Sequence, residues 1–145
     1  MNSPILIREM RADDALEVAA LSGELGYPAE PDEIGARIKA LRERPEHALF
    51  VACVDSALVG WIDVAIVHHL ASPAFGEIGG LVVSGKHRSR GIGEQLVARA
   101  EEWIGSRGIR KVVVRSRTTR ERAHQFYLRH GYSEWKRQAV FHKEL

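Results

Sequence analysis

The stretch that decides the fold is Glu77-Ile-Gly-Gly-Leu-Val-Val-Ser-Gly-Lys-His-Arg-Ser-Arg-Gly-Ile-Gly-Glu94. Its apolar run Leu81–Val83 predicts a buried strand, and a cationic loop with two glycines follows. Apolar residues then recur at helical spacing, at Ile92, Leu96, Val97, Ala100 and Ile104. A strand, a basic glycine loop and a helix start in this order predict an anion site, because the first N–H groups of a helix have no acceptor within it.

Length and composition predict one globular domain over residues 1–145. Hydrophobic residues make up 45% of the chain and charged residues 28%, which is ordinary for a globular protein. No apolar run approaches the roughly 18 residues of a membrane helix, and Met1-Asn-Ser-Pro lacks a signal-peptide pattern. We therefore expect a cytoplasmic protein with no membrane partner. Cys53 is alone, which excludes a disulfide framework and a thiol metal cluster.

Charge is unevenly distributed along the chain. Residues 1–85 hold 6 Lys/Arg and 13 Asp/Glu, whereas residues 86–122 hold 11 Lys/Arg and 4 Asp/Glu. The basic stretch suits an anionic ligand and the acidic stretch a cationic one. Two solvated faces of opposite sign explain the pattern equally well. Nucleic-acid binding is disfavoured, because the arginines lack interleaved aromatic residues.

Strand and helix signals alternate along the chain and predict a mixed α/β fold. A strand at Ile5–Arg8 precedes two helices between residues 13 and 45. The remaining predicted elements are strands at Leu49–Val54 and Leu58–Val67 around an Asp55-Ser56 turn, a loop from His68 to Gly76, a strand at Glu77–Val83, a helix over 92–106, a strand at Lys111–Arg115, a helix at Arg120–His130, and short strands around Ser133–Arg137 and Ala139–Glu144. The order β-α-α-β-β-β-α-β-α-β-β predicts a central mixed sheet with helices on its faces.

Two nucleotide motifs match the opening stretch only in part. Gly80 to Lys86 nearly spells a P-loop, but His87 replaces the Ser/Thr that would hold magnesium. Gly91-Ile92-Gly93 matches the start of a dinucleotide fingerprint, but Leu96 occupies the third glycine position. Neither motif therefore identifies the anion.

A third pattern matches in two places. Arg88-Ser89-Arg90-Gly91-Ile92-Gly93 resembles the (Arg/Gln)-x-x-Gly-x-(Gly/Ala) signature of the GNAT superfamily of N-acetyltransferases. The segment Ala-His-Gln-Phe-Tyr-Leu-Arg-His-Gly-Tyr at 123–132 is similar to that superfamily's Ala-x-x-Phe-Tyr-x-x-x-Gly-(Phe/Tyr) segment. The order of elements also matches, so the resemblance covers nearly the whole chain. One departure is Arg120, where many members carry an asparagine that contacts the cofactor.

The resemblance implies acetyl-CoA as the acetyl donor and a GNAT-like fold with a twisted sheet. The backbone at Leu81, Val82 and Val83 would pair with the pantetheine arm and the thioester carbonyl. The loop would hold the pyrophosphate through Arg88, Ser89, Arg90, Gly91, Ile92 and Gly93. Arg120 is either a further cofactor contact or a solvated arginine in the first turn of a helix.

The resemblance also implies roles for side chains in acyl transfer. Tyr127 matches the tyrosine that protonates the departing thiolate, although a core position is the common reading of a helical tyrosine. Glu77 matches a carboxylate that accepts the amine proton and helps to bind the substrate; a surface acid at a strand end is the alternative. His68, His69, His87 and water are other candidate bases. Tyr27 lies in the loop that borders the acceptor pocket of the family, or packs on the core. His68-His69 lacks further ligands, so no metal site is predicted.

These inferences predict an enzyme that transfers acetyl from acetyl-CoA to an amine by direct attack in a ternary complex. The alternative is a non-catalytic module that binds or senses acyl-CoA. The resemblance further suggests a homodimer. The acceptor stays open between a small amine, an aminoglycoside, an amino acid, a protein N-terminus and a lysine.

Overall fold

The computed structural model describes residues 3–24, 26–88 and 90–145, and its elements follow the predicted order as far as residue 129. Two units are distinguished, Met1–Val114 and Arg115–Leu145. The strands of the first unit are β1 (Leu6–Glu9), β2 (His47–Val54), β3 (Ala57–His69), β4 (Ser72–Val83) and β5 (Val112–Val114), its helices are α1 (Ala15–Glu24), α2 (Pro31–Arg42) and α3 (Ile92–Ser106), and the second unit contains α4 (Glu121–Arg129).

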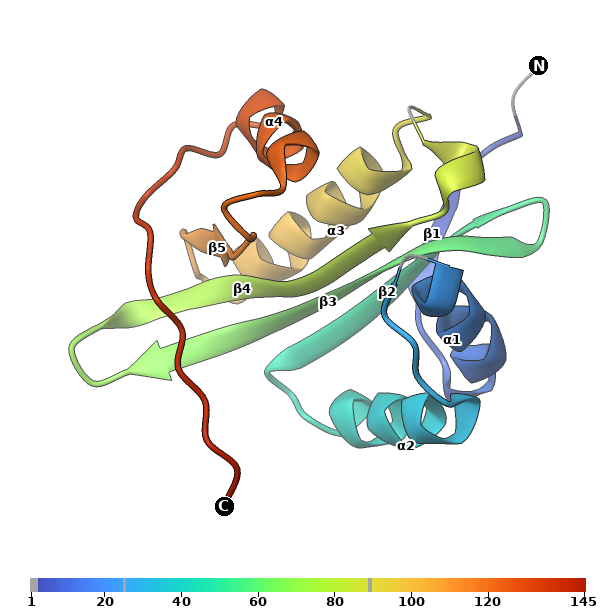
Figure 1. The fold of residues 1–145 in the computed structure, drawn as a ribbon, viewed down its shortest axis with the longest axis horizontal. Coiled ribbons are helices and arrows are strands. Elements are labelled where there is room, and N and C mark those ends of the chain that lie inside the picture. The colour runs from blue at the N-terminus through green and yellow to red at the C-terminus, as the bar shows by residue number, and fades with distance from the viewer. Residues whose placement is uncertain (1–2, 25, 89) are drawn as a thin grey trace. The chain divides into compact units, whose positions relative to one another are not determined.

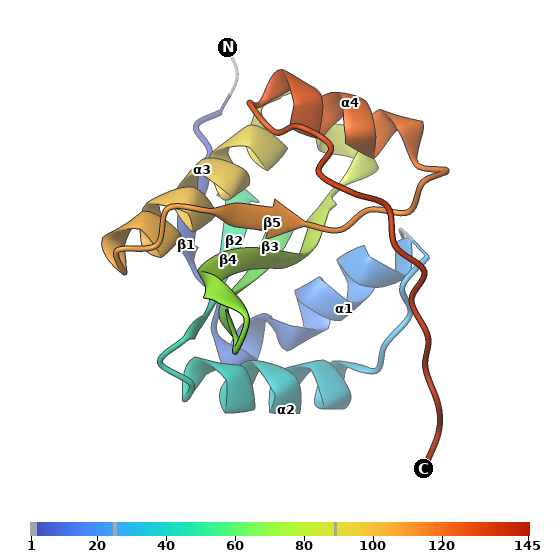
Figure 2. The same cartoon turned by 90° about the vertical axis from the view of Figure 1, so that its left-hand side faces the viewer.

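The strands of the first unit form one mixed sheet, which confirms the predicted class. Over the described residues the strand order is β1-β2-β3-β4-β5. Neighbours pair antiparallel from β1 to β4, whereas β4 and β5 pair in parallel. Helices α1 and α2 cover one face of this sheet and α3 covers the other (Figures 1 and 2). The parallel pair requires a crossover connection, and α3 supplies it.

The predicted hairpin is confirmed, but its neighbour is longer than expected. Asp55 and Ser56 have φ values of 50° and 67°, the left-handed conformation of a two-residue hairpin turn. The predicted loop from His68 to Gly76 is wrong, because β3 runs to His69 and β4 begins at Ser72. Pro73 is tolerated in β4 because β5 pairs only with residues 76–78, which leaves β4 an edge strand at this point.

The core has one apolar layer on each face of the sheet. On one face, α3 buries Leu96 and Ile104 against the sheet, and Gly60 and Gly76 allow its close approach. On the other face, the buried residues of α1 and α2 join the inward side chains of β2 and its neighbours, namely Val18, Leu21, Ile38, Leu49, Val51, Cys53, Leu58 and Val82. Cys53 is part of this layer, and its burial raises the pKa of its thiol.

The prediction of two C-terminal strands, around Ser133–Arg137 and Ala139–Glu144, is wrong. Gly131, with φ of 89°, ends the region of α4, and no strand is assigned to residues 133–145. The apolar side chains of Trp135, Val140 and Phe141 are exposed there. A strand needs a hydrogen-bonded neighbour and an apolar face that packs, and an isolated pair of strands is marginal even when it forms. The apolar residues of this segment therefore do not suffice for strands.

A charged pair anchors the start of α1 to β1. Arg8 donates two hydrogen bonds of 2.8 Å to the two carboxylate oxygens of Asp14, and the Arg11 backbone N–H donates another of 2.7 Å. Asp14 is only 4% exposed. The Arg8 hydrogen bonds hold the pKa of Asp14 below its usual value. The ionised carboxylate is therefore preferred in the folded state.

We expect Asp14→Asn to lower the free energy of unfolding by about 2 kcal/mol at pH 7, because it leaves a half-buried arginine without its anion. A lowered carboxyl pKa stabilises the fold above the unfolded-state pKa, and this stability is lost as pH falls through the folded-state pKa. The difference between the two proteins should therefore shrink below about pH 4. Urea unfolding across pH measures it.

Asp13→Asn is the matched control, because Asp13 is exposed and lies 3.7 Å from the Arg11 guanidinium. It should change stability by less than about 0.5 kcal/mol. Equal losses in the two variants would contradict the role assigned to the Arg8–Asp14 pair.

Candidate active site

Strands β4 and β5 separate midway along β4. Their parallel pairing joins residues 76–78 to residues 112–114 and ends there. β4 continues to Val83 and keeps its pairing with β3. Residues 79–83 therefore lie beyond the last ladder partner on β5. Over the described residues no strand is recorded as pairing with this edge of β4 beyond Ile78, and an unpaired strand edge is where an extended ligand can add.

The predicted pantetheine segment lies within this separated part of β4. Val82 is buried in the core on the face of α1 and α2, whereas Leu81 and Val83 are half-buried. The side chain of Val82 is thus occupied with packing. The part of Val82 that remains for a ligand is its backbone; the contact of Leu81, Val82 and Val83 with a pantetheine arm stays a prediction.

The glycine loop ends in the N-terminus of α3. Gly91 has φ of 82°, a left-handed conformation that favours glycine, and it precedes the helix without a side-chain cap. The first hydrogen bond of the helix runs from Gln95 N–H to Gly91 C=O, at 3.0 Å. The N–H groups of Ile92, Gly93 and the next residue precede that bond, so they form the kind of site that binds phosphate. The side chain of Ile92 is buried and contributes packing.

The arginines of the loop differ in their surroundings. Arg88 is exposed, whereas Arg90 is half-buried and donates a hydrogen bond of 3.4 Å to the Ser3 carbonyl. Ser89, also predicted to bind the cofactor, lies outside the described residues. Both described arginines flank the start of α3, where their charge adds to that of the helix N-terminus.

Glu77 points to the opposite face of the sheet from α3. A Cβ on the preceding residue, Gly76, would lie 2.4 Å from the Ile104 side chain of α3. Successive strand residues alternate between faces, so Glu77 faces the side of α1 and α2. It lies opposite Ala65 of β3 and is half-buried. Tyr27, in the connection between α1 and α2, is 48% exposed.

The histidines named as alternative bases have different neighbours. His68 Nε2 lies 2.5 Å from a carboxylate oxygen of Glu46, and His69 stacks on Phe75 with ring centroids 5.6 Å apart. His87 Nδ1 is buried and has no hydrogen-bond partner within the part of the chain that is described. These contacts do not bring His68 or His69 to the separated part of β4.

A pair that the sequence analysis did not single out lies on the same face as Glu77. His47, at the start of β2, contacts a carboxylate oxygen of Asp63 on β3. The sequence held one signal for this pair, the acidic residue Asp63 inside the otherwise apolar strand segment Trp61-Ile-Asp-Val64. His47 and Asp63 are 16 residues apart, so only the strand register could have joined them.

The remaining predicted side chains belong to the second unit. Burial raises the pKa of Tyr127, and the charge of Arg120 opposes this shift. The Tyr127 ring packs edge-on against Phe126, at 5.2 Å, and Tyr132, at 5.6 Å. Arg120 precedes the first turn of α4 and makes no side-chain cap. A phenol that stays protonated at neutral pH can act as an acid.

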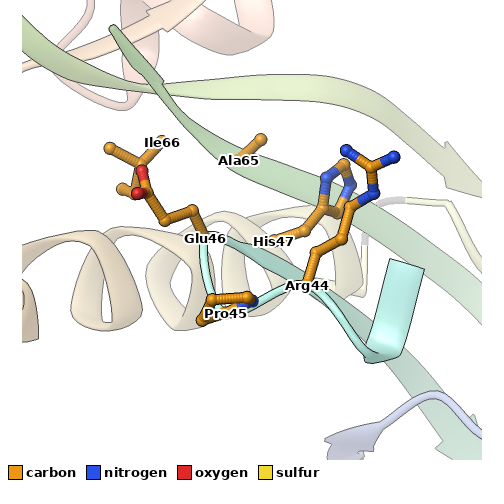
Figure 3. A pocket seen from close by; sticks show the side chains of 6 residues that line it. All are labelled: Arg44, Pro45, Glu46, His47, Ala65 and Ile66. Atoms are coloured by element: carbon orange, nitrogen blue, oxygen red, sulfur yellow. The ribbon is translucent and has the colours of Figure 1, made fainter. Parts of the chain in front are cut away.

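A pocket of about 410 Å³ lies at the start of β2 (Figure 3). His47 and Ala65 line it together with Arg44, Pro45, Glu46 and Ile66. Among the described residues, no group of three or more His, Cys, Asp or Glu side chains is arranged to hold a metal ion. None of the described helices has the length and hydropathy to span a membrane.

Comparison with known proteins gives concordant matches. The acetyltransferase (GNAT) family model matches residues 13–132, a range that includes both motifs quoted above. An aminoalkylphosphonate N-acetyltransferase from Salmonella typhimurium is 34% identical over 121 residues, covering 83% of this chain and 76% of that protein.

Solved structures show the same fold. The aminoglycoside N-acetyltransferase AAC(6')-Iy in complex with CoA matches with a TM-score of 0.87 at 21% identity, covering 100% of this chain and 98% of that one. AAC(6')-Iy in complex with the bisubstrate analogue CoA-S-monomethyl-acetylneamine matches with a TM-score of 0.86 at 22% identity, covering 99% and 100%.

Proposed function

Because the chain belongs to the acetyltransferase (GNAT) family, we propose that it transfers the acetyl group of acetyl-CoA directly to the nitrogen of a small-molecule amine. The separation of β4 from β5 carries this proposal. It leaves a strand edge for the pantetheine arm, at Leu81–Val83, next to the loop that leads to the N-terminus of α3. The thioester would then end at the level of Gly79 and Gly80.

The two substrates would approach from opposite faces of the sheet. The pyrophosphate would bind at Arg88–Gly93, at the start of the helix that covers one face. The amine would arrive on the face of α1 and α2, where Glu77 points and where Tyr27 borders the connection between the helices. Both substrates can therefore be bound at once, which direct transfer requires.

The chemistry needs a neutral amine and a protonated leaving group. Glu77 accepts a proton from the acceptor ammonium, directly or through water, and frees the nitrogen lone pair. The nitrogen attacks the thioester carbonyl, the C–S bond breaks, and the nitrogen gives up its second proton to solvent, from which the phenolate of Tyr127 is reprotonated after the transfer. Tyr127 donates its proton to the departing sulfur, for which its raised pKa suits it. Arg120 is a further candidate contact for the cofactor.

A small-molecule acceptor is the class supported by the relatives. The Salmonella protein is named for aminoalkylphosphonates and AAC(6')-Iy for aminoglycosides. Both are small molecules that carry amino groups. The homodimer implied by the sequence resemblance stays a prediction.

Binding and turnover should be measured separately. Saturating CoA at 100 times its dissociation constant should stabilise the protein by about 2.7 kcal/mol, which for a chain of this size is a rise in Tm of about 5–10 °C. Arg88→Ala should weaken CoA binding about tenfold, because a charged phosphate contact is lost. Arg37→Ala, on the exposed side of α2, should leave it unchanged.

Thiol release from acetyl-CoA over a panel of small amines then tests catalysis. Turnover of at least one amine supports the proposal. Stabilisation by CoA without turnover of any amine would instead favour a module that senses acyl-CoA. No stabilisation by CoA would contradict both functions.

A further inference from the structure

The His47–Asp63 pair joins β2 and β3 on the face where the acceptor would bind, beside Glu77 of β4. His47 of β2 lies opposite Ala65 of β3, which in turn lies opposite Glu77 of β4. The His47 ring donates from Nε2 to Oδ1 of Asp63, because a carboxylate can only accept. The side chains of His47 and Asp63 are 18% and 31% exposed, so the carboxylate remains accessible to a solute.

The second oxygen of Asp63 lies over a bulge in β4. Asp63 pairs with Gly80 and Val64 pairs with Ile78, so Gly79 is an extra residue between these pairs. A Cβ on Gly79 would lie 3.2 Å from Oδ2 of Asp63 and 3.5 Å from its Cγ. The missing side chain of Gly79 therefore makes room for this carboxylate.

The Asp63 carboxylate lies beside the point of β4 where the pairing with β5 ends. Gly79 is the first β4 residue beyond the last β5 partner. Glu77 lies opposite Ala65, which shares a face with Asp63 because alternate residues of a strand point to the same side. Asp63 and Glu77 therefore present carboxylates on one face of neighbouring strands, where each is placed to pair with a different cationic group of one ligand.

We propose that Asp63 is a specificity-determining residue for the acceptor, binding a second cationic group of the substrate while Glu77 serves the reacting amine. The substrate class is an amine with a second ammonium group. His47 is a positioning residue that holds Oδ1, so that Oδ2 is directed toward Gly79. This inference rests on the proposed function, whose acceptor side it completes.

An anionic acceptor is the competing class. Arg44 lines the pocket beside His47 (Figure 3), and a guanidinium suits a phosphonate. The Asp63 carboxylate would repel that group. The charge of the preferred acceptor therefore decides between the two classes.

The test compares Asp63→Asn with wild type on an alkyl diamine, an alkyl monoamine of matched length and an aminoalkylphosphonate. For the diamine we expect kcat/KM to fall about tenfold, mainly through KM, because a partly exposed ionic contact is lost. The monoamine should change less than about twofold, the phosphonate should improve, and the KM for acetyl-CoA should not change. Glu102→Gln on α3, an exposed acid on the opposite face of the sheet, is the matched control and should behave as wild type.

His47→Asn is a second route to the same site, because it removes the ring that holds Oδ1 of Asp63. It should show the same acceptor pattern more weakly and add little to Asp63→Asn in the double variant.

Losses of equal size for diamine and monoamine, or an unchanged diamine KM, would overturn the inference while leaving the transferase function intact. A protein that neither binds CoA nor acetylates any amine would instead refute the proposed function. The thermal-shift measurement with CoA separates these two failures.

Discussion

The Tyr127→Phe variant is expected to turn over about a hundredfold more slowly than wild type, because general acid catalysis contributes at least that much to an acyl transfer. The substitution removes the hydroxyl that would protonate the departing thiolate and keeps the ring that packs on Phe126 and Tyr132. Affinity for CoA should not change, because the loss falls on the transition state. Thiol release gives kcat, and the thermal shift gives the affinity.

The pH profile provides an independent readout of the same role. Burial raises the pKa of Tyr127 above its usual range, so the phenol stays protonated, and able to donate, across neutral and mildly alkaline pH. Activity should fall only as pH rises through this raised value, and the variant should lack that alkaline decline. Tyr132→Phe is the control for the tyrosines of this unit and should keep turnover within about twofold. Equal losses in both variants would remove Tyr127 as the acid.

Gly76→Ala is expected to lower the free energy of unfolding by about 3 kcal/mol, which is the upper end of the usual cost of overpacking a protein core. The added Cβ would lie 2.4 Å from Cδ1, 2.5 Å from Cγ1 and 2.7 Å from Cγ2 of Ile104. Ile104 is only 1% exposed, so its side chain has no room to move. Either α3 or β4 must shift, and both carry parts of the proposed donor site. Thermal and urea unfolding measure the loss.

A double-mutant cycle isolates this contact. Ile104→Ala alone should cost about 2–5 kcal/mol through the cavity it leaves. In that background the added methyl at position 76 fills part of the cavity, so Gly76→Ala should become neutral or stabilising. Gly105→Ala is the control, because nothing lies within 4 Å of its added Cβ, and it should stabilise α3 by up to about 1 kcal/mol. Additive losses in the double variant would contradict the predicted clash.

Much of the sheet and its helices could be predicted because local signals agreed with the tertiary fold. The helix over residues 92–106 was predicted with the bounds that are observed, since its apolar spacing and its flanking glycines point the same way. The hairpin at Asp55-Ser56 followed from two apolar runs around a polar pair. In both cases a short window of sequence contains the deciding information.

The wrong predictions of secondary structure concern segments whose conformation depends on pairing with a segment distant in the sequence. Pro73 suggested a loop, but the short β5 leaves β4 an edge at that point, where proline is tolerated. Two strands were predicted after Gly131, yet the apolar side chains of that segment, Trp135, Val140 and Phe141, are exposed. A propensity for extended structure becomes a strand only if a partner satisfies its backbone.

Most of the residues proposed for the acetyl donor are neighbours in sequence, whereas those proposed for the acceptor are not. The loop Arg88–Gly93, proposed to bind the pyrophosphate, is contiguous, so its glycines and arginines form a pattern that is visible without a structure. The His47–Asp63 pair is formed by the β2–β3 register and reaches β4 through a bulge at Gly79. A bulge shifts a side chain by one position, which no local pattern specifies.

The location of Glu77 and α3 on opposite faces of the sheet has a consequence for how such an enzyme can diversify. The residues proposed to recognise the amine lie on the face of α1 and α2, whereas the loop proposed for the donor leads into α3 and its own apolar layer. Substitutions distant from one another and without shared partners act nearly independently. Changes on α1, α2 and their connection, away from β4, would then alter the choice of acceptor and leave the proposed pyrophosphate loop untouched.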